Sequence, residues 1–482
     1  MSRVAAPQPY LCTMKLTFWG AARQVTGSKH LLELEDGTTV LIDCGLDYED
    51  KKNFDLNNAR FPFDPEKIDL LILTHAHIDH SGNIPNLIKQ GFDGLIVCTP
   101  PTLELSDFLL HDSLNIQRME IARKRKKFSK RKKGQYRDSV PSPLYSAKHI
   151  MDMIDRVETV DFGTRYEYND NLTLQFYTAG HILGAASVVL EVRENGETKR
   201  IGFTGDLGNK NSKLVPDPVP MPKLNYLVSE STYGGRKHEQ HSKKAEEIML
   251  REIQETCVEN GGKLVVPAFS VGRTQAILFT LHQLYREGKL PNIKIFTDSP
   301  LAIKSTRVYQ HSLPYLNEEA KAFHAKHGSL FDFDNLYVIQ DEKESEVLSE
   351  IPDPCVIISA AGMVEGGRIQ MHVKNNIGGE NNTVLIAGFC AEGTLGHRLM
   401  SGQDFVEINH KPRAVRAAVR KTDAFSAHPD HDQLLDYFKA CDEGHLDSLF
   451  LVHGDPLQME ILARDVRHCT VHTPNPGDSF SL

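Results

Sequence analysis

Short apolar runs recur along the chain, and several of them end in a residue that can bind a metal or move a proton. The run at residues 68–73 predicts a fully buried strand and leads into the segment THAHIDHSG. On an extended backbone, His75 and His77 point the same way, whereas Asp79 and His80 are expected in the turn that follows. Four ligand-type residues within six positions disfavour a plain polar loop. The pattern therefore predicts two neighbouring metal sites.

Three further strands are expected near the beginning of the chain, at residues 16–20, 30–35 and 40–43, with a hairpin turn at Asp36-Gly37. Asp43 ends the third strand. Its carboxylate can accept a hydrogen bond from an imidazole N–H of the His cluster, or it can cap the turn at Cys44-Gly45. The residues alone leave these two roles open.

The pattern of an apolar run followed by a reactive side chain recurs four more times. LTLQFYTAGHILG leads to His181, IGFTGDLG to Asp206, NYLVSESTYGG to Glu230 and LFLVHGD to His453. In layered α/β proteins, sites assemble at strand ends and in the loops that follow them. A single histidine of this kind is more often structural, but as a set these residues complete the coordination that the His cluster leaves open.

Between residues 223 and 420 the chain alternates between predicted strands and helices. A strand at 263–269 is expected to lead into a helix capped by Ser270, and a second strand at 293–297 leads into a helix after DSPLA. Two later strands are followed by the glycine-rich turns GMVEGGR and GTLGHR. Such turns let backbone amides approach an anion, or they simply make tight turns, and both readings stay open.

Composition makes this an ordinary globular protein. The chain has 482 residues, of which 40% are hydrophobic and 25% charged, which suits two or three domains. It has no apolar run of 18 residues and no secretory signal at its N-terminus, so we expect a cytoplasmic protein without a membrane segment. The cysteines form no Cys-x-x-Cys pair and are expected to be reduced and mostly buried: Cys12, Cys44, Cys98, Cys257, Cys355, Cys390, Cys441 and Cys469.

One basic segment stands out in a chain that is acidic overall. The formal net charge is −9, which gives no global signal for a polyanionic partner. The segment from Arg123 to Arg137 is densely basic, however, and could attract nucleic acid through its phosphates. It could equally be a solvated insertion.

Taken together, these motifs resemble the metallo-β-lactamase superfamily and, within it, the β-CASP branch of nucleases. LIDCG, HAHIDH, His181 and Asp206 match the superfamily motifs in order, and SEST, FSAHPDH and LVHGD match the β-CASP motifs. The resemblance implies an α/β fold, an αββα sandwich interrupted by a Rossmann-like β-CASP domain. The expected division is residues 1–222 and 419–482 for the sandwich and 223–418 for the inserted cap.

The resemblance also implies a role for each residue of the site. His75, His77 and His181 would hold one zinc ion, Asp79, His80 and His453 a second, and Asp206 would bridge the two. Manganese or iron(II) fits the same ligands. A hydroxide shared by the two metals would attack the phosphorus, with Asp79 among the catalytic residues. His428, oriented by Glu230, would protonate the leaving oxygen.

For the substrate, the histidine of the last motif points to RNA within this branch. The expected protein is a compact, stand-alone, zinc-dependent endoribonuclease, similar to the cleavage nuclease of messenger-RNA 3′-end processing, that cuts single-stranded RNA. The alternatives are a DNA nuclease of the same superfamily and a non-catalytic RNA-binding paralogue, and a homodimer is left open. The candidate RNA contacts are Ser270, Arg273, Arg368 and Arg398, whereas structural, surface or bystander roles are expected for His372, His397 and His431.

Overall fold

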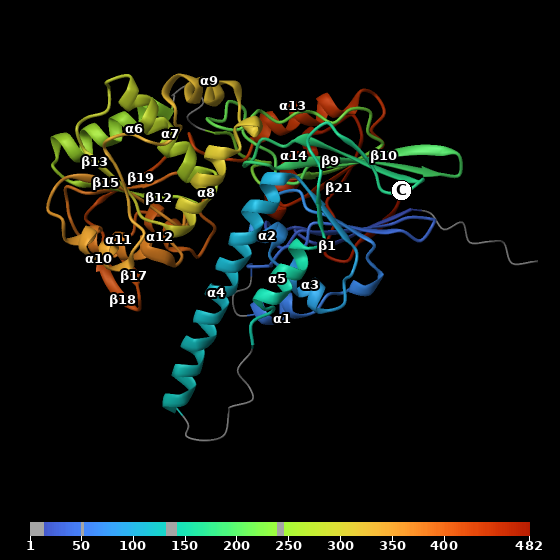
Figure 1. Cartoon of the computed structure of the whole chain (residues 1–482), viewed down its shortest axis with the longest axis horizontal. Helices are drawn as coiled ribbons and strands as arrows, with labels where there is room; N and C mark the ends of the chain where they lie inside the picture. Colours follow the sequence, from blue (N-terminus) through green and yellow to red (C-terminus); the bar gives the residue numbers. More distant parts are fainter. Residues whose placement is uncertain (1–13, 50–52, 132–141, 239–244) are drawn as a thin grey trace, which may run out of the picture.

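The computed structural model describes residues 14–49, 53–131, 142–238 and 245–482 (Figure 1). Cys12 and residues 132–137 of the basic run lie outside these ranges. The other seven cysteines are free thiols, six of them buried, as expected.

Two seven-stranded sheets form the sandwich. In the order of their strands, the first sheet contains β22 (Ser479–Ser481), β1 (Lys15–Gly20), β2 (Lys29–Glu33), β3 (Thr39–Ile42), β4 (Leu70–Ile72), β5 (Leu95–Cys98) and β6 (Val157–Thr159). The second contains β21 (Thr470–His472), β20 (Ser448–Val452), β11 (Tyr226–Glu230), β10 (Glu197–Phe203), β9 (Ala186–Glu194), β8 (Leu172–Thr178) and β7 (Arg165–Glu167).

The inner faces of these sheets pack against each other through large apolar side chains. Phe18 of the first sheet lies 5.3 Å from Phe450 of the second, ring centroid to centroid, and both belong to one buried cluster with Phe176 and Phe203. The sandwich helices are α1 (Phe54–Ala59), α2 (Ile78–Ser81), α3 (Ile84–Lys89), α4 (Pro100–Arg131), α5 (Ala147–Ile154), α13 (His431–Asp442) and α14 (Pro456–Asp465). Helices α3, α4 and α5 pack on the first sheet, and α13 and α14 on the second. The result is the expected αββα arrangement.

The inserted cap is built on a third sheet, in which every strand is parallel to its neighbours. Its strand order is β14 (Leu336–Val338), β13 (Lys294–Thr297), β15 (Cys355–Ser359), β12 (Lys263–Pro267), β16 (Thr383–Ile386) and β19 (Ala418–Lys421). Parallel neighbours require crossover connections, and here these contain α7 (Arg273–Arg286), α8 (Pro300–His311), α9 (Glu318–His327), α10 (Glu342–Glu350), α11 (Gly367–Asn376) and α12 (Leu395–Met400). Helix α6 (Ala245–Ile253) precedes the sheet, and β17 (Phe405–Ile408) and β18 (Lys411–Ala414) form a separate hairpin.

Two strands near the expected domain boundaries pair across them. β11 lies in the second sandwich sheet, parallel to β10 and β20, although the boundary at 222/223 assigned it to the cap. β19 completes the cap sheet beside β16, although the boundary at 418/419 left most of it in the sandwich. The strands of the cap sheet therefore lie between Glu230 and Lys421, and the division into domains stays a prediction.

Two local predictions differ from the structure. Ser270 does not cap α7, because the chain makes a further turn and Gly272, at φ 82°, takes the cap position. Asp79 and His80 lie on the short helix α2 rather than in an open turn. The helix expected after DSPLA is present as α8, and its N-cap is Ser299, whose hydroxyl accepts a hydrogen bond from the Ala302 N–H at 3.2 Å.

Helix α4 is the longest of the described helices. Its 32 residues span about 48 Å, and in Figure 1 its C-terminal half projects away from both layers of the sandwich. Residues 123–126 of the basic run are exposed on this half of the helix. The N-terminal half packs against α8 of the cap. None of the described helices combines the length and apolarity of a membrane span.

Candidate metal centre

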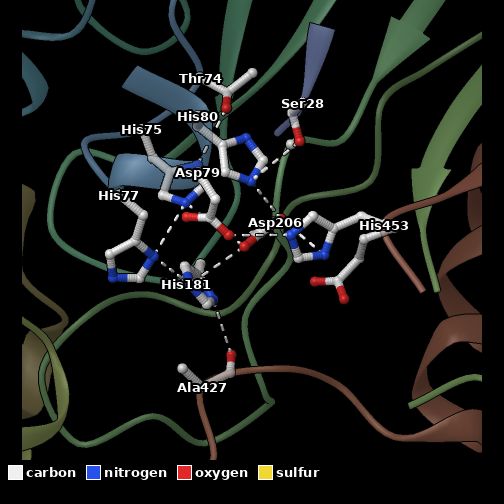
Figure 2. Close-up of polar contacts among 12 residues, drawn as sticks. Ser28, Thr74, His75, His77, Asp79, His80, His181, Asp206, Ala427 and His453 are labelled. Atoms are coloured by element: carbon white, nitrogen blue, oxygen red, sulfur yellow. Dashed lines mark hydrogen bonds and ion pairs between the residues drawn. The ribbon is translucent and has the colours of Figure 1, made fainter. Parts of the chain in front are cut away.

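Seven side chains from distant parts of the chain meet at one edge of the sandwich (Figure 2). His75 and His77 lie in the loop after β4, and Asp79 and His80 lie on α2. The other three follow the ends of β8, β10 and β20, which are the strands that the apolar runs predicted: His181, Asp206 and His453. The strand ends are thus where the site assembles, as expected for layered α/β architecture.

The first group consists of His75, His77, His181 and Asp206. The Nδ1 atom of His77 lies 3.2 Å from His75 Nε2 and 3.2 Å from His181 Nε2. Three imidazole nitrogens at this spacing fit the edges of a tetrahedron, which measure about 3.3 Å when the metal–nitrogen bonds are 2.0–2.1 Å. The donor set and its spacing therefore fit a zinc-type ion.

Asp79, His80 and His453 form the second group, and Asp206 lies between the two. Its Oδ1 is 3.2 Å from His80 Nε2, and its Oδ2 is 3.6 Å from His75 Nε2. Oδ1 is buried and accepts no well-directed hydrogen bond from a described residue. One carboxylate oxygen thus faces each group, which is the arrangement of a ligand bridging two ions.

Hydrogen bonds to the far side of three of the rings leave their inner nitrogens directed at the site. His80 donates its Nδ1–H to Asp43 Oδ2 at 2.7 Å, so Asp43 supports an imidazole, which is the first of its two expected roles. His75 contacts the Thr74 hydroxyl through Nδ1 at 3.1 Å, and His181 contacts the carbonyl of Ala427 through Nδ1 at 3.3 Å. A donor bond of this kind fixes the tautomer whose opposite nitrogen carries a lone pair.

Electrostatics distinguish the two groups. Burial lowers the pKa of His75 and His181 well below the ordinary value, and it lowers the pKa of His77 to about 4, so these rings are neutral ligands at neutral pH. Burial also disfavours charge on His80 and His453, but the Asp206 carboxylate raises the pKa of both above the ordinary value. The second group thus attracts positive charge, which a metal ion could supply in place of protons.

A histidine–glutamate pair lies beside the metal ligands. Glu230, fully buried at the end of β11, accepts hydrogen bonds from His428 Nδ1 at 3.0 Å and from the backbone N–H of Leu207 at 2.6 Å. The His428 ring lies 4.6 Å from the His181 ring, and its side chain is 20% exposed. Burial alone would lower the pKa of His428, yet the Glu230 carboxylate raises it. The pair is therefore suited to deliver a proton next to the metal ligands.

The remaining candidate residues have varied surroundings. Arg368 is bound to the buried carboxylate of Asp298 at 2.6 Å, and His372 is bound to the same carboxylate at 2.6 Å. His372 therefore has the structural role expected of it. Ser270 is partly exposed beside α7, and Arg398 is partly buried on α12 with His397.

The histidine next to the dyad is structural too. His431 donates to the Gly234 carbonyl at 2.5 Å, and its Nε2 lies 3.1 Å from Asp465, so it is a bystander to the metal ligands.

Sequence reasoning missed three groups that hold the ligands in place. Thr74 donates to Asp43 Oδ2 at 2.8 Å while it contacts His75, and Thr232 lies 3.1 Å from His453 Nδ1. The third group is the Ala427 carbonyl, which no side-chain pattern could reveal. The two threonines belong to the segments THAHIDH and SEST, and their place beside a candidate ligand or acid-base residue was the one signal available.

The fold and the ligand set define a binuclear metallo-hydrolase with an inserted cap. Residues 27–232 match the metallo-β-lactamase superfamily, residues 274–399 the β-CASP domain, and residues 413–474 the Zn-dependent metallo-hydrolase RNA specificity domain. The chain belongs to the β-CASP branch of the metallo-β-lactamase superfamily. This membership and the cluster of histidines and aspartates together indicate a binuclear metal site.

Relatives match nearly the whole chain. Ribonuclease TTHA0252 of Thermus thermophilus is 31% identical over 94% of this chain and 95% of its own length. An RNase J-like protein of Methanocaldococcus jannaschii is 30% identical, over 92% and 93% respectively. Transcription termination factor FttA of the same archaeon is 31% identical over 94% of this chain but 69% of its own length.

A solved structure of a protein of unknown function from Enterococcus faecalis shares the fold. The superposition has a TM-score of 0.54 at 11% identity and covers 98% of this chain and all of that one.

Proposed function

We propose that this protein is a metal-dependent ribonuclease that cuts single-stranded RNA internally. The observation that carries the proposal is the His428–Glu230 pair beside two groups of metal ligands that share Asp206. Hydrolysis of a phosphodiester requires an activated water and a proton for the leaving oxygen, and the site has residues for both tasks. The ribonuclease and RNase J-like names of two relatives with near-complete coverage support RNA as the substrate.

The ligand assignment gives the two ions unequal partners. His75, His77 and His181 would hold one zinc and Asp79, His80 and His453 the other, and Asp206 would contribute to both. Two bound ions would lower the pKa of water and neutralise charge on the reacting phosphate. Asp79 is the carboxylate of the second group, and 25% of its side chain is exposed to solvent. It is therefore placed to orient an incoming water.

His428 serves as the general acid. Its Nδ1–H is held by Glu230, which leaves Nε2 as the atom that carries the transferable proton. Because Glu230 raises the pKa of this ring, the imidazolium form is available near neutral pH. The proton goes to the departing 3′ oxygen of the RNA strand.

The test compares single-stranded RNA and DNA of the same sequence, labelled at one end, with the zinc-loaded protein. We expect internal cuts in RNA, loss of cleavage in Asp206→Ala and a large loss in His428→Ala. His410→Ala is the matched control, because His410 also pairs with a glutamate, Glu407 at 3.3 Å, but on an exposed hairpin.

Each alternative has its own outcome. Equal cleavage of DNA would identify a DNA nuclease, a ladder of mononucleotides would identify an exonuclease, and tight RNA binding without cleavage would identify a binding protein. Cleavage that survives Asp206→Ala would refute the assignment of the metal centre.

A further inference from the structure

Arg273 lies where the cap meets the loop that carries His181. It is the first residue of α7, and it lines a cavity of about 1010 Å³ that His181 also lines. A Cβ atom at the preceding Gly272 would lie 2.9 Å from Ile182 Cγ2. The start of α7 is thus pressed against the residue that follows the metal ligand His181.

The guanidinium of Arg273 is enclosed by apolar and backbone surfaces. It lies 4.5 Å from the centre of the Phe269 ring. A Cβ at Gly362 would approach Nη1 to 3.2 Å, and a Cβ at Gly388 would approach Nη2 to 2.6 Å. Two glycines therefore make room for this side chain, which is only 8% exposed.

Arg273 has no partner for its charge within the described part of the chain. Its Nε is buried without a hydrogen bond, and no described residue forms an ion pair with the guanidinium. Asp423 is the nearby carboxylate, but it lies 3.2 Å from the ammonium of Lys421. Arg368 differs in this respect, because Asp298 compensates its charge.

A buried cation without an anion is costly, and proteins retain such groups at sites that bind a ligand of opposite charge. Burial lowers the pKa of Arg273, in line with this cost. We infer that Arg273 binds a backbone phosphate of the RNA strand in the cavity beside His181. The inference rests on the proposed ribonuclease function.

A continuous line of contacts leads from Arg273 to the general acid. Gly388, which touches the guanidinium, is followed by Phe389, and the Phe389 ring lies 6.1 Å from the Tyr233 ring. The Tyr233 ring in turn lies 6.2 Å from the His428 ring. The bound phosphate is therefore one that flanks the scissile linkage on the side of the cap, and Arg273 positions the strand without touching the reacting atoms.

The experiment measures binding of labelled single-stranded RNA in which one linkage at a time is a neutral methylphosphonate. It uses the zinc-loaded His428→Ala protein, which keeps all seven metal ligands, and the same protein with Arg273→Met. With Arg273 present, one linkage near the cleavage position should weaken binding by about 10- to 100-fold when neutralised. In the Arg273→Met protein that penalty should vanish at this linkage alone. The slope of the logarithm of the binding constant against the logarithm of the salt concentration should decrease in magnitude by about 0.7.

Arg286→Met is the matched control, since Arg286 ends the same helix and also lies over an aromatic ring, that of Tyr285 at 5.6 Å. It should leave the methylphosphonate profile unchanged. The melting temperature of Arg273→Met should equal or exceed that of the wild type, because a buried unpaired charge is removed.

Identical profiles with and without Arg273 would overturn the inference, as would a lower melting temperature with unchanged RNA binding. The proposed ribonuclease function is judged separately, by cleavage of unmodified RNA by the wild-type protein. Cleaved RNA with no linkage specific to Arg273 refutes the phosphate contact alone.

Discussion

Replacing Asp43 with asparagine should weaken one of the two metal sites far more than the other. Asp43 accepts hydrogen bonds from His80 Nδ1 at 2.7 Å, from the Thr74 backbone N–H at 2.8 Å and from the Thr74 hydroxyl at 2.8 Å. Asparagine keeps one acceptor for the backbone N–H but presents an NH₂ group to His80. Asp43 has φ 59°, a conformation that asparagine tolerates well, so the substitution tests the side chain alone.

The magnitude follows from the bond that is lost. A hydrogen bond to a charged group contributes about 1.5–3 kcal/mol, which corresponds to about 10- to 150-fold in a binding constant. The NH₂ group also favours the His80 tautomer that protonates Nε2, and this removes the lone pair that faces Asp206. We therefore expect the affinity of the ion held by His80 to fall about 10- to 100-fold.

Competition with a chromophoric zinc chelator, followed by metal analysis of the protein, measures this change. The variant should release one zinc per chain at the lower chelator concentration and keep the second. Asp69→Asn is the control, because Asp69 accepts a backbone N–H from Thr39 at 2.8 Å at an exposed position of the same sheet. Two zinc ions released as in the wild type would show that the hydrogen bond from His80 to Asp43 does not set the affinity of this ion.

Three further outcomes are expected. Asp298→Asn should lower the free energy of unfolding by about 3 kcal/mol at neutral pH, as measured by urea unfolding. Burial alone would raise the pKa of Asp298, but His372 and Arg368 lower it, so the loss of stability should shrink as the pH falls below 3.8. Neutralising the exposed basic residues 123–126 on α4 should weaken RNA binding and flatten its salt dependence, and an unchanged slope in a salt titration would leave them a solvated surface. Tyr309→Phe leaves the buried Leu183 N–H without its 3.0 Å acceptor, so hydrogen exchange of this amide should accelerate, consistent with a local cost of about 1–3 kcal/mol.

The candidate ligands could be selected from the sequence because each of them is a polar side chain in an unusual place. A histidine or aspartate shortly after a buried strand is visible as a break in an apolar pattern, and His75, His181 and Asp206 each lie three positions after the end of their strand. The partners of the ligands could not be predicted in this way. Every residue has a backbone carbonyl, so nothing in the sequence marks that of Ala427 as a partner of His181. Thr74 looks like an ordinary strand end until the fold brings Asp43 beside it.

The sheet that β11 joins and the start of α7 could not be predicted for a different physical reason. β11 is buried among parallel neighbours, as are the strands of the cap, so its apolar pattern cannot tell which sheet it joins. The helix start at Gly272 was missed because Ser270 is a preferred cap residue, whereas the close approach of Gly272 to Ile182 is a tertiary constraint. Patterns along the chain describe the environment of a strand but not the identity of its neighbour.

The position of His453 in the chain affects how activity arises during synthesis. This ligand follows β20, which pairs with β11 across more than two hundred intervening residues, and β22 then adds to the edge of β1. While the polypeptide is still emerging from the ribosome, every other metal ligand and the whole cap are made before His453. A chain synthesised only as far as the end of the cap therefore lacks His453 and β20, and the second group of candidate ligands becomes complete only after both have been made.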